Sequence, residues 1–204
     1  MKNYIYINNH KIELTEEQVK QILTAGDHSG KKLSEFEAGD IAAIGSHKMI
    51  VLDHIGGNTL LLRKDSLRTM AFGRGNNYNG SDVDRVCNEF AEELAGIVGE
   101  ENIILHEVDL TADDGLKDYG KIQRKASLRT ADMQRKYVEI LDKYRLDIWE
   151  WLATAFSIPP HDEDNWVKCV SPSGYFISGV CNYDNIGVRP FLILKSTIFE
   201  SLEG

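Results

Sequence analysis

The sequence predicts a mixed α+β protein in which small antiparallel sheets are accompanied by two main helices. Short runs of alternating apolar and polar residues, separated by Gly, Asn and Ser, are typical of strands joined by tight turns. Two other stretches begin with a capping residue and continue with apolar residues at helical spacing. The chain has 204 residues, of which 42% are hydrophobic, and this length is enough to bury a sizeable core.

The N-terminal residues are expected to form a small unit of their own. Between residues 4 and 14, two alternating apolar runs flank a polar turn and predict a β-hairpin. Thr15 follows at once and is the predicted N-cap of a short helix. Residues 27–32 are mostly polar and predict a linker. We therefore expect a ββα element with its linker at residues 1–32, and the main domain at residues 33–204.

The main domain is expected to begin with an antiparallel meander and to continue with helices and further strands. Ser81 is the predicted N-cap of the first main helix, Gly99 is its predicted end, and Thr130 begins the second helix. An Asn- and Gly-rich loop at residues 72–79 precedes the first helix. The strands expected here are residues 41–44, 49–53, 59–63, 103–108, 166–170, 174–178 and 188–195.

The charge of the chain narrows the classes of partner. The formal net charge is −9, from 23 basic and 32 acidic side chains. An acidic surface repels phosphate backbones and anionic lipid headgroups, so we expect no direct nucleic-acid binding and no membrane binding. The charge suits a protein partner with a basic surface, and it also suits a role in solubility alone.

Targeting signals and cysteines give the expected location. The N-terminus lacks the basic and apolar regions of a signal peptide, and no apolar run approaches the ~20 residues that span a bilayer. The cysteines are Cys87, Cys169 and Cys181, an odd and sparse set that argues against a secreted disulfide framework. We therefore expect a cytoplasmic protein.

Several short motifs follow one another in order along residues 33–201. They include Asn77-Tyr78-Asn79-Gly80-Ser81, Ser127-Leu128-Arg129-Thr130-Ala131, Trp149-Glu150-Trp151-Leu152 and Gly187-Val188-Arg189-Pro190. Together they resemble a family of uncharacterised domains found in bacteria and their phages, whose fold is similar to the C-type-lectin-like fold. The same fold serves sulfatase-modifying factors and the variable proteins made by diversity-generating retroelements.

The resemblance implies a small twisted sheet that supports long loops, with two helices packed around it and recognition carried by the loops. It also implies a bacterial host cell as the location, with a phage as one source of the gene. The family has no established activity to carry over. The sequence departs from the family pattern at Asp84-Arg85 and Ala153, where an arginine is displaced or replaced, and at Glu150, which interrupts a tryptophan pair.

Six residues are candidate ligand contacts. Aromatic side chains dominate recognition surfaces, and a guanidinium can bind carboxylates or carbonyls. For Trp149 and Trp151 the alternative is core packing, and for Arg189 it is a local clamp on the acidic Asp113-Asp114 stretch. The candidates are Trp149, Trp151, Trp166, Tyr175, Asn182 and Arg189.

The loop at residues 109–120 is rich in aspartate. Clustered carboxylates are the ligands that Ca²⁺ requires, but the spacing does not fit an EF-hand, which needs a bidentate glutamate where Gly120 stands. A solvated acidic loop is the preferred interpretation, and neither a metal nor a cofactor is predicted. The aspartates are Asp109, Asp113, Asp114 and Asp118.

No catalytic constellation is recognisable in the sequence, which has no zincin, Walker or nucleophile-elbow motif. Cys169 and Cys181 resemble the cysteine pair with which one branch of the fold superfamily oxidises a substrate. Their separation along the chain places them on different predicted strands. We expect two small buried apolar residues and a protein that is not an enzyme.

The expected function is that of a non-enzymatic binding protein. Its ligand would be a protein or a small molecule, held by the loops at residues 72–80, 109–120 and 157–165. The alternative is a phage-encoded inhibitor of a bacterial defence system, which blocks a Cas effector by acidic mimicry or sequesters a signalling nucleotide. Mimicry predicts acidic residues gathered on one face, and sequestration predicts a pocket with a buried Arg or Lys. A third hypothesis, a cysteine oxidase, requires Cys169 and Cys181 to approach each other in a cleft.

Overall fold

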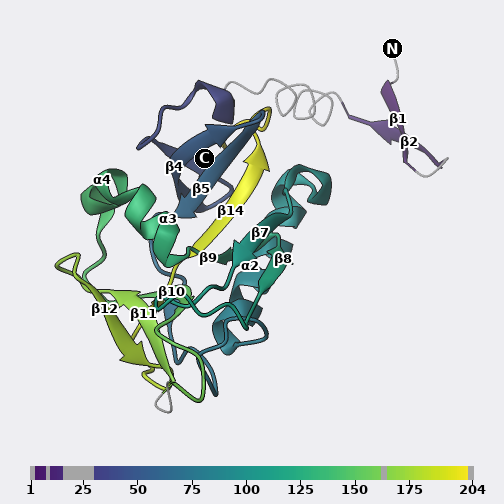
Figure 1. The fold of residues 1–204 in the computed structure, drawn as a ribbon. Helices are drawn as coiled ribbons and strands as arrows, with labels where there is room; N and C mark the ends of the chain where they lie inside the picture. The colour runs from purple at the N-terminus through teal and green to yellow at the C-terminus, as the bar shows by residue number, and fades with distance from the viewer. Residues whose placement is uncertain (1–2, 8–9, 16–29, 162–164, 202–204) are drawn as a thin grey trace.

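The computed structural model describes residues 3–7, 10–15, 30–161 and 165–201. Within these residues the protein is mixed α+β, with several small, mainly antiparallel sheets and few helices, which confirms the predicted class (Figure 1).

The first sheet has five antiparallel strands in the order β3-β4-β5-β14-β9. The predicted meander forms its first half, because glycine turns join β3 to β4 and β4 to β5. Gly45, Gly56 and Gly57 adopt positive φ at these turns, a conformation that glycine reaches without steric cost. The strands are β3 (Ile41–Ile44), β4 (His47–Ile55), β5 (Asn58–Arg63), β14 (Pro190–Lys195) and β9 (Ala126–Leu128).

The second sheet also has five strands, in the order β12-β11-β10-β13-β6. Its β10–β13 pair is parallel and its other pairs are antiparallel. The aromatic and apolar stretch around Trp151 forms β10, and every residue of this strand is buried. The strands are β12 (Phe176–Val180), β11 (Trp166–Val170), β10 (Glu150–Ala155), β13 (Gly187–Val188) and β6 (Arg68–Thr69).

Two hairpins complete the strands. The predicted N-terminal hairpin is present as β1 (Asn3–Ile7) and β2 (His10–Leu14), while the helix predicted after Thr15 lies outside the described residues. The second hairpin pairs β7 (His106–Asp109) with β8 (Lys121–Arg124). The sequence predicted neither β8 nor β9.

Both main helices begin at the predicted caps. Ser81 accepts a hydrogen bond from the Asp84 N–H at the start of α2 (Asp82–Val98), and Thr130 accepts one from the Met133 N–H at the start of α3 (Ala131–Lys136). The second predicted helix breaks at its C-cap, Tyr137, and resumes as α4 (Val138–Leu141). Three short 3₁₀ helices are also present, η1 (Leu33–Glu35), η2 (Glu100–Asn102) and η3 (Asp142–Tyr144).

Helix α2 joins the two sheets. Its first half contributes Val83, Val86 and Cys87 to the core cluster that contains Trp151 and Val167 of the second sheet. Its second half contributes Phe90, Ala91 and Leu94 to the cluster that contains Leu61 and Leu192 of the first sheet. The helix therefore holds the sheets in a fixed relation by apolar packing along its whole length.

A buried ionic centre joins the same two sheets. Glu150 on β10 receives hydrogen bonds from Arg129, which follows β9, and from Arg189, which precedes β14. The three side chains are 1–5% exposed. Burial alone would raise the pKa of the Glu150 carboxyl, but the two guanidinium groups outweigh it and hold this pKa below its usual value.

The chain enters and leaves the main body at one place. The N–H of Leu33 donates to the Ile198 carbonyl (2.8 Å), and the N–H of Glu200 donates to the Lys31 carbonyl (2.9 Å). Lys31 and Lys32, which belong to the predicted linker, are thus paired with the C-terminal segment.

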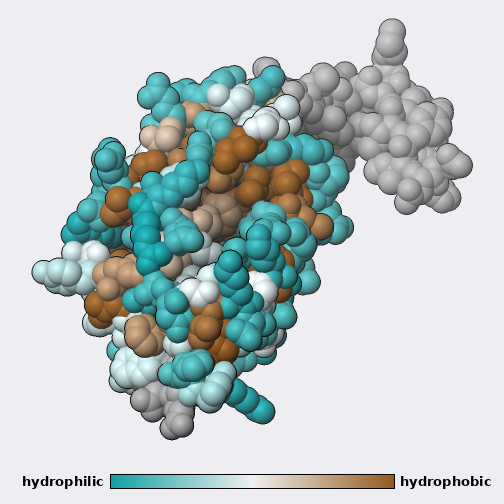
Figure 2. Space-filling model, viewed as in Figure 1, coloured by the Kyte–Doolittle hydropathy of each residue, from teal (hydrophilic) through white to brown (hydrophobic). Residues whose placement is uncertain are grey.

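The described surface is mixed in character. In the view of Figure 2, small apolar patches are separated by polar side chains. In the described part of the chain, no helix is both long and apolar enough to cross a membrane.

Candidate functional site

The three loops that the sequence predicts as a recognition surface lie together, and the side chain of Asn76 joins them. Asn76 is 1% exposed. Its amide donates to the carbonyls of Ser157 (2.9 Å) and Trp166 (3.3 Å), and its oxygen accepts the Tyr119 hydroxyl (2.6 Å). One buried side chain therefore fixes loop 72–80 to the other two loops. We call this joined surface, residues 72–80, 109–120 and 157–161, the loop face.

Further contacts hold the acidic loop in place. The N–H of Asp113 donates to the Ala155 carbonyl at the end of β10 (2.9 Å), and the Ser157 hydroxyl donates to the Asp114 carboxylate. Beneath them, Ala112, Ala155 and Ile158 form a small apolar cluster against Leu116 and Tyr119. The loop is thus positioned by both backbone bonds and packing, rather than left free in solvent.

A cleft of about 420 Å³ opens beside this loop. One wall is formed by residues 107–115 and the other by the first turns of α3. Thr154 on β10 also lines the cleft, and its hydroxyl accepts the Ala131 N–H (2.9 Å). Four of the lining side chains are acidic and one is basic, so we name this hollow the acidic cleft. The charged lining residues are Glu107, Asp109, Asp113, Asp132 and Arg135.

Salt bridges organise the charges of the acidic cleft. Asp113 lies between Arg135 and Lys168, with Lys168 Nζ at 3.2 Å. Arg135 also binds Asp132 (2.8 Å), whose side chain is 91% exposed. Lys121 binds Glu107 (2.7 Å) and lies 3.5 Å from Asp109. The carboxylates are held in position by these cations, while Asp132 remains open to solvent.

Local hydrogen bonds keep the loop carboxylates ionised. Two bonds from Thr111, through its hydroxyl and its N–H, are the main cause of the lowered pKa of Asp109. The Ser157 hydroxyl is the main cause of the lowered pKa of Asp114. Each bond stabilises the charged form of its carboxylate, so Asp109 and Asp114 are ionised at neutral pH.

Aromatic side chains flank the acidic cleft. Lys168 is nearly buried, with its ammonium 4.5 Å from the ring centre of Phe176, and the Arg135 guanidinium lies 5.0 Å from the same ring centre. Phe156, whose ring centre lies 5.8 Å from the same ammonium, is 47% exposed. The cations that bind Asp113 are therefore also held by aromatic faces on β12.

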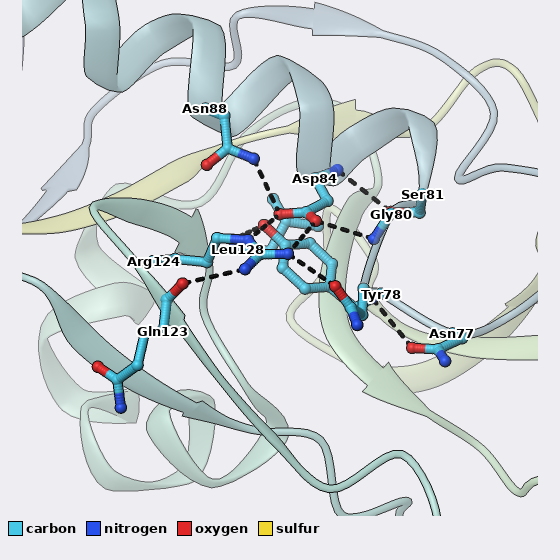
Figure 3. Close-up of polar contacts among 10 residues, drawn as sticks. Asn77, Tyr78, Gly80, Ser81, Asp84, Asn88, Gln123, Arg124 and Leu128 are labelled. Atoms are coloured by element: carbon cyan, nitrogen blue, oxygen red, sulfur yellow. Dashed lines mark hydrogen bonds and ion pairs between the residues drawn. The ribbon is translucent and has the colours of Figure 1, made fainter.

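A second polar cluster lies at the start of α2 and is drawn in Figure 3. The Asp84 carboxylate is 2% exposed and accepts two bonds from Arg124 (2.7 and 2.8 Å) and one from the Gly80 N–H (2.9 Å). Arg124 also donates to Asn79 (2.8 Å). These bonds fix the β7–β8 hairpin to the helix. The hydrogen bonds of this buried carboxylate hold two elements together, and the arrangement is that of a structural clamp.

The sequence-predicted site residues separate into buried and exposed sets. Trp151 is fully buried, and its indole N–H donates to the Met70 carbonyl (2.9 Å). Arg189 is 1% exposed and binds Glu150 and the Arg63 carbonyl. Both therefore have the interior roles that the sequence offered as alternatives. The predicted partner of Arg189, the Asp113-Asp114 stretch, is wrong, because Glu150 supplies the buried carboxylate.

The other four candidates have some access to solvent. Trp149 is half-buried against the core cluster of the second sheet, and Trp166 is half-buried on β11. Tyr175 and Asn182 are exposed, and so is Asp118 of the acidic loop. Asn76, Asp132, Arg135 and Lys168 were not among the site residues predicted from the sequence. For Asn76 the available signal was its place in an Asn- and Gly-rich loop.

The two cysteines of the oxidase hypothesis are not paired. Cys169 lies opposite Ile177 on β12, whereas the Cys181 N–H bonds to the Asn165 carbonyl at the far end of β11. Four residues of strand separate these positions, which is about 13 Å. Both thiols are buried and neither forms a disulfide, and burial raises the pKa of Cys169 to about 12. The contact that this hypothesis requires is therefore lacking.

In the residues that the structure describes, no three His, Cys, Asp or Glu side chains are grouped closely enough to hold a metal ion. No protein-family model matches the sequence, and no match was found among curated proteins or solved structures.

Proposed function

We propose that this chain is a non-enzymatic binding protein whose loop face and acidic cleft recognise a protein partner that presents basic residues. The observation that carries the proposal is the Asn76 junction, which makes one ordered surface of three loops that are far apart in the sequence. Preorganised loops on a rigid scaffold are the usual location of a binding site, since little ordering entropy is lost when the ligand arrives.

The charge of the acidic cleft supports a cationic group on the partner. The four lining carboxylates outnumber the one lining guanidinium, and the chain as a whole carries a net charge of −9. A Lys or Arg side chain could enter the cleft and bind Asp132 without displacing a buried ion pair. Exposed Phe156, whose ring centre lies 5.8 Å from Lys168 Nζ, would add apolar contact beside it.

We further infer that residues 33–204 form a C-type-lectin-like domain, as the resemblance implies. Small antiparallel sheets, two main helical segments and recognition loops on one surface are the features that support this inference. The contacts between Glu150 and Arg189 also hold the β10 and β14 segments in one body.

The second candidate function is a phage-encoded inhibitor that mimics nucleic acid. It is supported by the exposed outer face of α2 and the residues after it, which carry several carboxylates. Arg68 and Arg85 neutralise part of this face through Glu89 and Asp82. The exposed carboxylates are Glu89, Glu92, Glu93, Glu100 and Glu101. The nucleotide-sequestering version has less support, because Arg129 and Arg189 are both bound to Glu150.

Two matched charge reversals separate these functions. Asp132→Lys alters the acidic cleft and Glu92→Lys alters α2, and both change the net charge equally. Each variant and the unmodified chain would be used as bait in a bacterial lysate at low and high salt, with mass spectrometry of captured proteins and small molecules. The affinity for each captured protein would then be measured with purified components.

If the loop face is the binding surface, Asp132→Lys weakens the affinity about tenfold or more, and Glu92→Lys leaves it nearly unchanged. The reverse pattern would support nucleic-acid mimicry instead. A partner that binds both variants as tightly as the unmodified chain would contradict the two functions together.

A further inference from the structure

Arg135 fills part of the acidic cleft with its own guanidinium group. One terminal nitrogen of this group binds Asp113, and the other binds Asp132 (2.8 Å). The centre of the guanidinium group lies 5.0 Å from the ring centre of Phe176. The cleft therefore already holds one guanidinium group, which belongs to the chain itself. We call the three groups around it, the carboxylates of Asp113 and Asp132 and the ring of Phe176, the guanidinium seat.

The inner part of the guanidinium seat is held in place independently of Arg135. The Asp113 N–H donates to the Ala155 carbonyl (2.9 Å), and the second carboxylate oxygen of Asp113 lies 3.2 Å from Lys168 Nζ. The Lys168 side chain is only 8% exposed. Phe176 belongs to β12, which pairs along its length with β11. Asp113 thus keeps a counter-charge when Arg135 moves away, so the seat should persist without it.

Arg135, by contrast, is open to solvent and can leave the seat. Its side chain is 53% exposed, and its second carboxylate partner, Asp132, is 91% exposed. Ion pairs of this kind contribute little to stability, because water solvates both ions when they separate. Exposed side chains also change rotamer rapidly. Another cation that enters the cleft can therefore compete with Arg135 for the same carboxylates.

The geometry of the seat favours a guanidinium group over an ammonium group. A guanidinium group is planar and carries several N–H donors, so it can bind two carboxylates through different nitrogens while it contacts an aromatic ring. The ammonium group of a lysine is a compact and strongly hydrated point charge, which loses more solvation on entering such a site. Arg135 shows that these two carboxylates and this ring accept a guanidinium group together.

We propose that Arg135 is an internal competitor, which an arginine side chain of the partner displaces from the guanidinium seat. This inference rests on the proposed function, and it adds both the recognised residue, arginine, and a means of control. The partner's arginine binds Asp113 and Asp132, and the displaced Arg135 side chain turns into solvent. The apparent affinity is reduced to the extent that Arg135 fills the seat, because only molecules with an open seat can bind.

Two peptides that differ only in their cation test the proposal, acetyl-Gly-Arg-Gly-amide and acetyl-Gly-Lys-Gly-amide. Their dissociation constants for the full chain would be measured by NMR titration at constant ionic strength. Arg135→Gln opens the seat, so it should tighten binding of the arginine peptide about fivefold or more and binding of the lysine peptide about twofold or less.

Lys121→Gln is the matched control for charge. It also removes one cation beside the cleft, because Lys121 binds Glu107 (2.7 Å) and lies 3.5 Å from Asp109, but it leaves Arg135 in the seat. It should tighten binding of both peptides equally, by about twofold or less. Adding Asp132→Asn to Arg135→Gln should remove most of the gain for the arginine peptide. Circular dichroism confirms that each variant is folded.

Three results would overturn the proposal. In the first, Arg135→Gln tightens binding of both peptides to the same degree, or no more than Lys121→Gln does, so that charge alone explains the gain. In the second, the gain persists after Asp132→Asn is added. In the third, neither the unmodified chain nor Arg135→Gln binds the arginine peptide at millimolar concentrations.

The peptide titrations and the capture of partners from a lysate give separate answers. Selective tightening of the arginine peptide, without any captured protein that depends on Asp132, would support the guanidinium seat and contradict the proposed function. A captured protein that depends on Asp132, together with equal binding of the two peptides by Arg135→Gln, would contradict the seat alone.

Discussion

The buried ionic centre and the acidic cleft use the same chemical groups in opposite ways. At the ionic centre, Glu150 lies between Arg129 and Arg189, and all three side chains are almost completely buried. At the cleft, Arg135 joins Asp113 to Asp132, and the Arg135 and Asp132 side chains are 53% and 91% exposed. The buried charges cannot exchange partners without leaving a desolvated ion, whereas the exposed ones can. Burial therefore decides which charges serve the fold and which are available to a ligand.

The largest effect is expected at the ionic centre. Glu150→Gln leaves two buried guanidinium groups without a counter-charge and should lower the free energy of unfolding by about 3–5 kcal/mol. Urea denaturation measures this value. The matched change at the cleft, Asp132→Asn, removes an exposed carboxylate and should cost less than about 1 kcal/mol. Equal losses for the two variants would contradict the contrast between buried and exposed charge.

The second effect concerns the pH dependence of stability that the buried His106 on β7 produces. His106 contacts Ser127 through Nε2 (2.9 Å), and burial lowers its pKa from 6.5 to about 4. The unfolded chain therefore binds a proton between these values that the folded chain does not. Stability should fall as the pH drops from 6.5 to 4, by up to about 3 kcal/mol from this group.

Urea denaturation at several pH values tests this expectation, and His106→Gln should flatten the profile over the same range. An NMR titration that finds the His106 imidazole charged at pH 6 would show that the ring is solvated, contrary to its burial in the structure. Glu150 adds a separate loss at lower pH, because its pKa is depressed and its contribution disappears as the pH falls below its unfolded value of 4.5.

The third effect tests the junction of the loop face. Asn76→Ala removes the hydrogen bonds to the Ser157 and Trp166 carbonyls and the one from the Tyr119 hydroxyl, so it should lower the unfolding free energy by about 1–3 kcal/mol. Hydrogen exchange should also become faster in residues 109–120. Asn77→Ala is the control, since Asn77 makes a local bond to the Asn79 N–H. Unchanged exchange in the acidic loop would show that the loops are ordered independently.

The smallest effect is expected for the exposed cation of the cleft. Arg135→Gln removes the bonds to Asp113 and Asp132, but solvent screens both, and Lys168 still neutralises Asp113. The free energy of unfolding should change by about 1 kcal/mol or less. A loss as large as that of Glu150→Gln would mean that the cleft belongs to the structural core rather than to a surface poised for a ligand.

Local patterns predicted the elements that local forces determine. The meander, the caps at Ser81 and Thr130, and the end of α2 at Gly99 depend on turn and capping residues close by in sequence, and all are present. β8 was missed because Lys121-Ile122-Gln123-Arg124 has a single apolar residue and resembles a solvated loop. Its identity as a strand comes from pairing with β7.

Long-range partners were not predictable from one sequence. Charged residues are rarely buried, so composition favoured an exposed Glu150 and gave no reason to connect it with Arg129 and Arg189. Asp84 and Arg124 are 40 positions apart, and Asn76 and Ser157 are 81 apart. The three loops were predicted as a group, but the side chain that joins them follows only from the folded arrangement.

Lys31–Leu33 lie beside residues 198–200, so the segments that enter and leave the main body are neighbours. Chain ends that lie side by side can be joined by a short peptide, or attached to two neighbouring residues of a host protein, with little distortion. A circular permutant reopened at the exposed Gly56-Gly57 turn would keep the strand order of both sheets and the packing of α2, although β4 and β5 would no longer be joined in the chain. The body could likewise be inserted into a surface loop of a carrier, which would display the loop face as a rigid cassette.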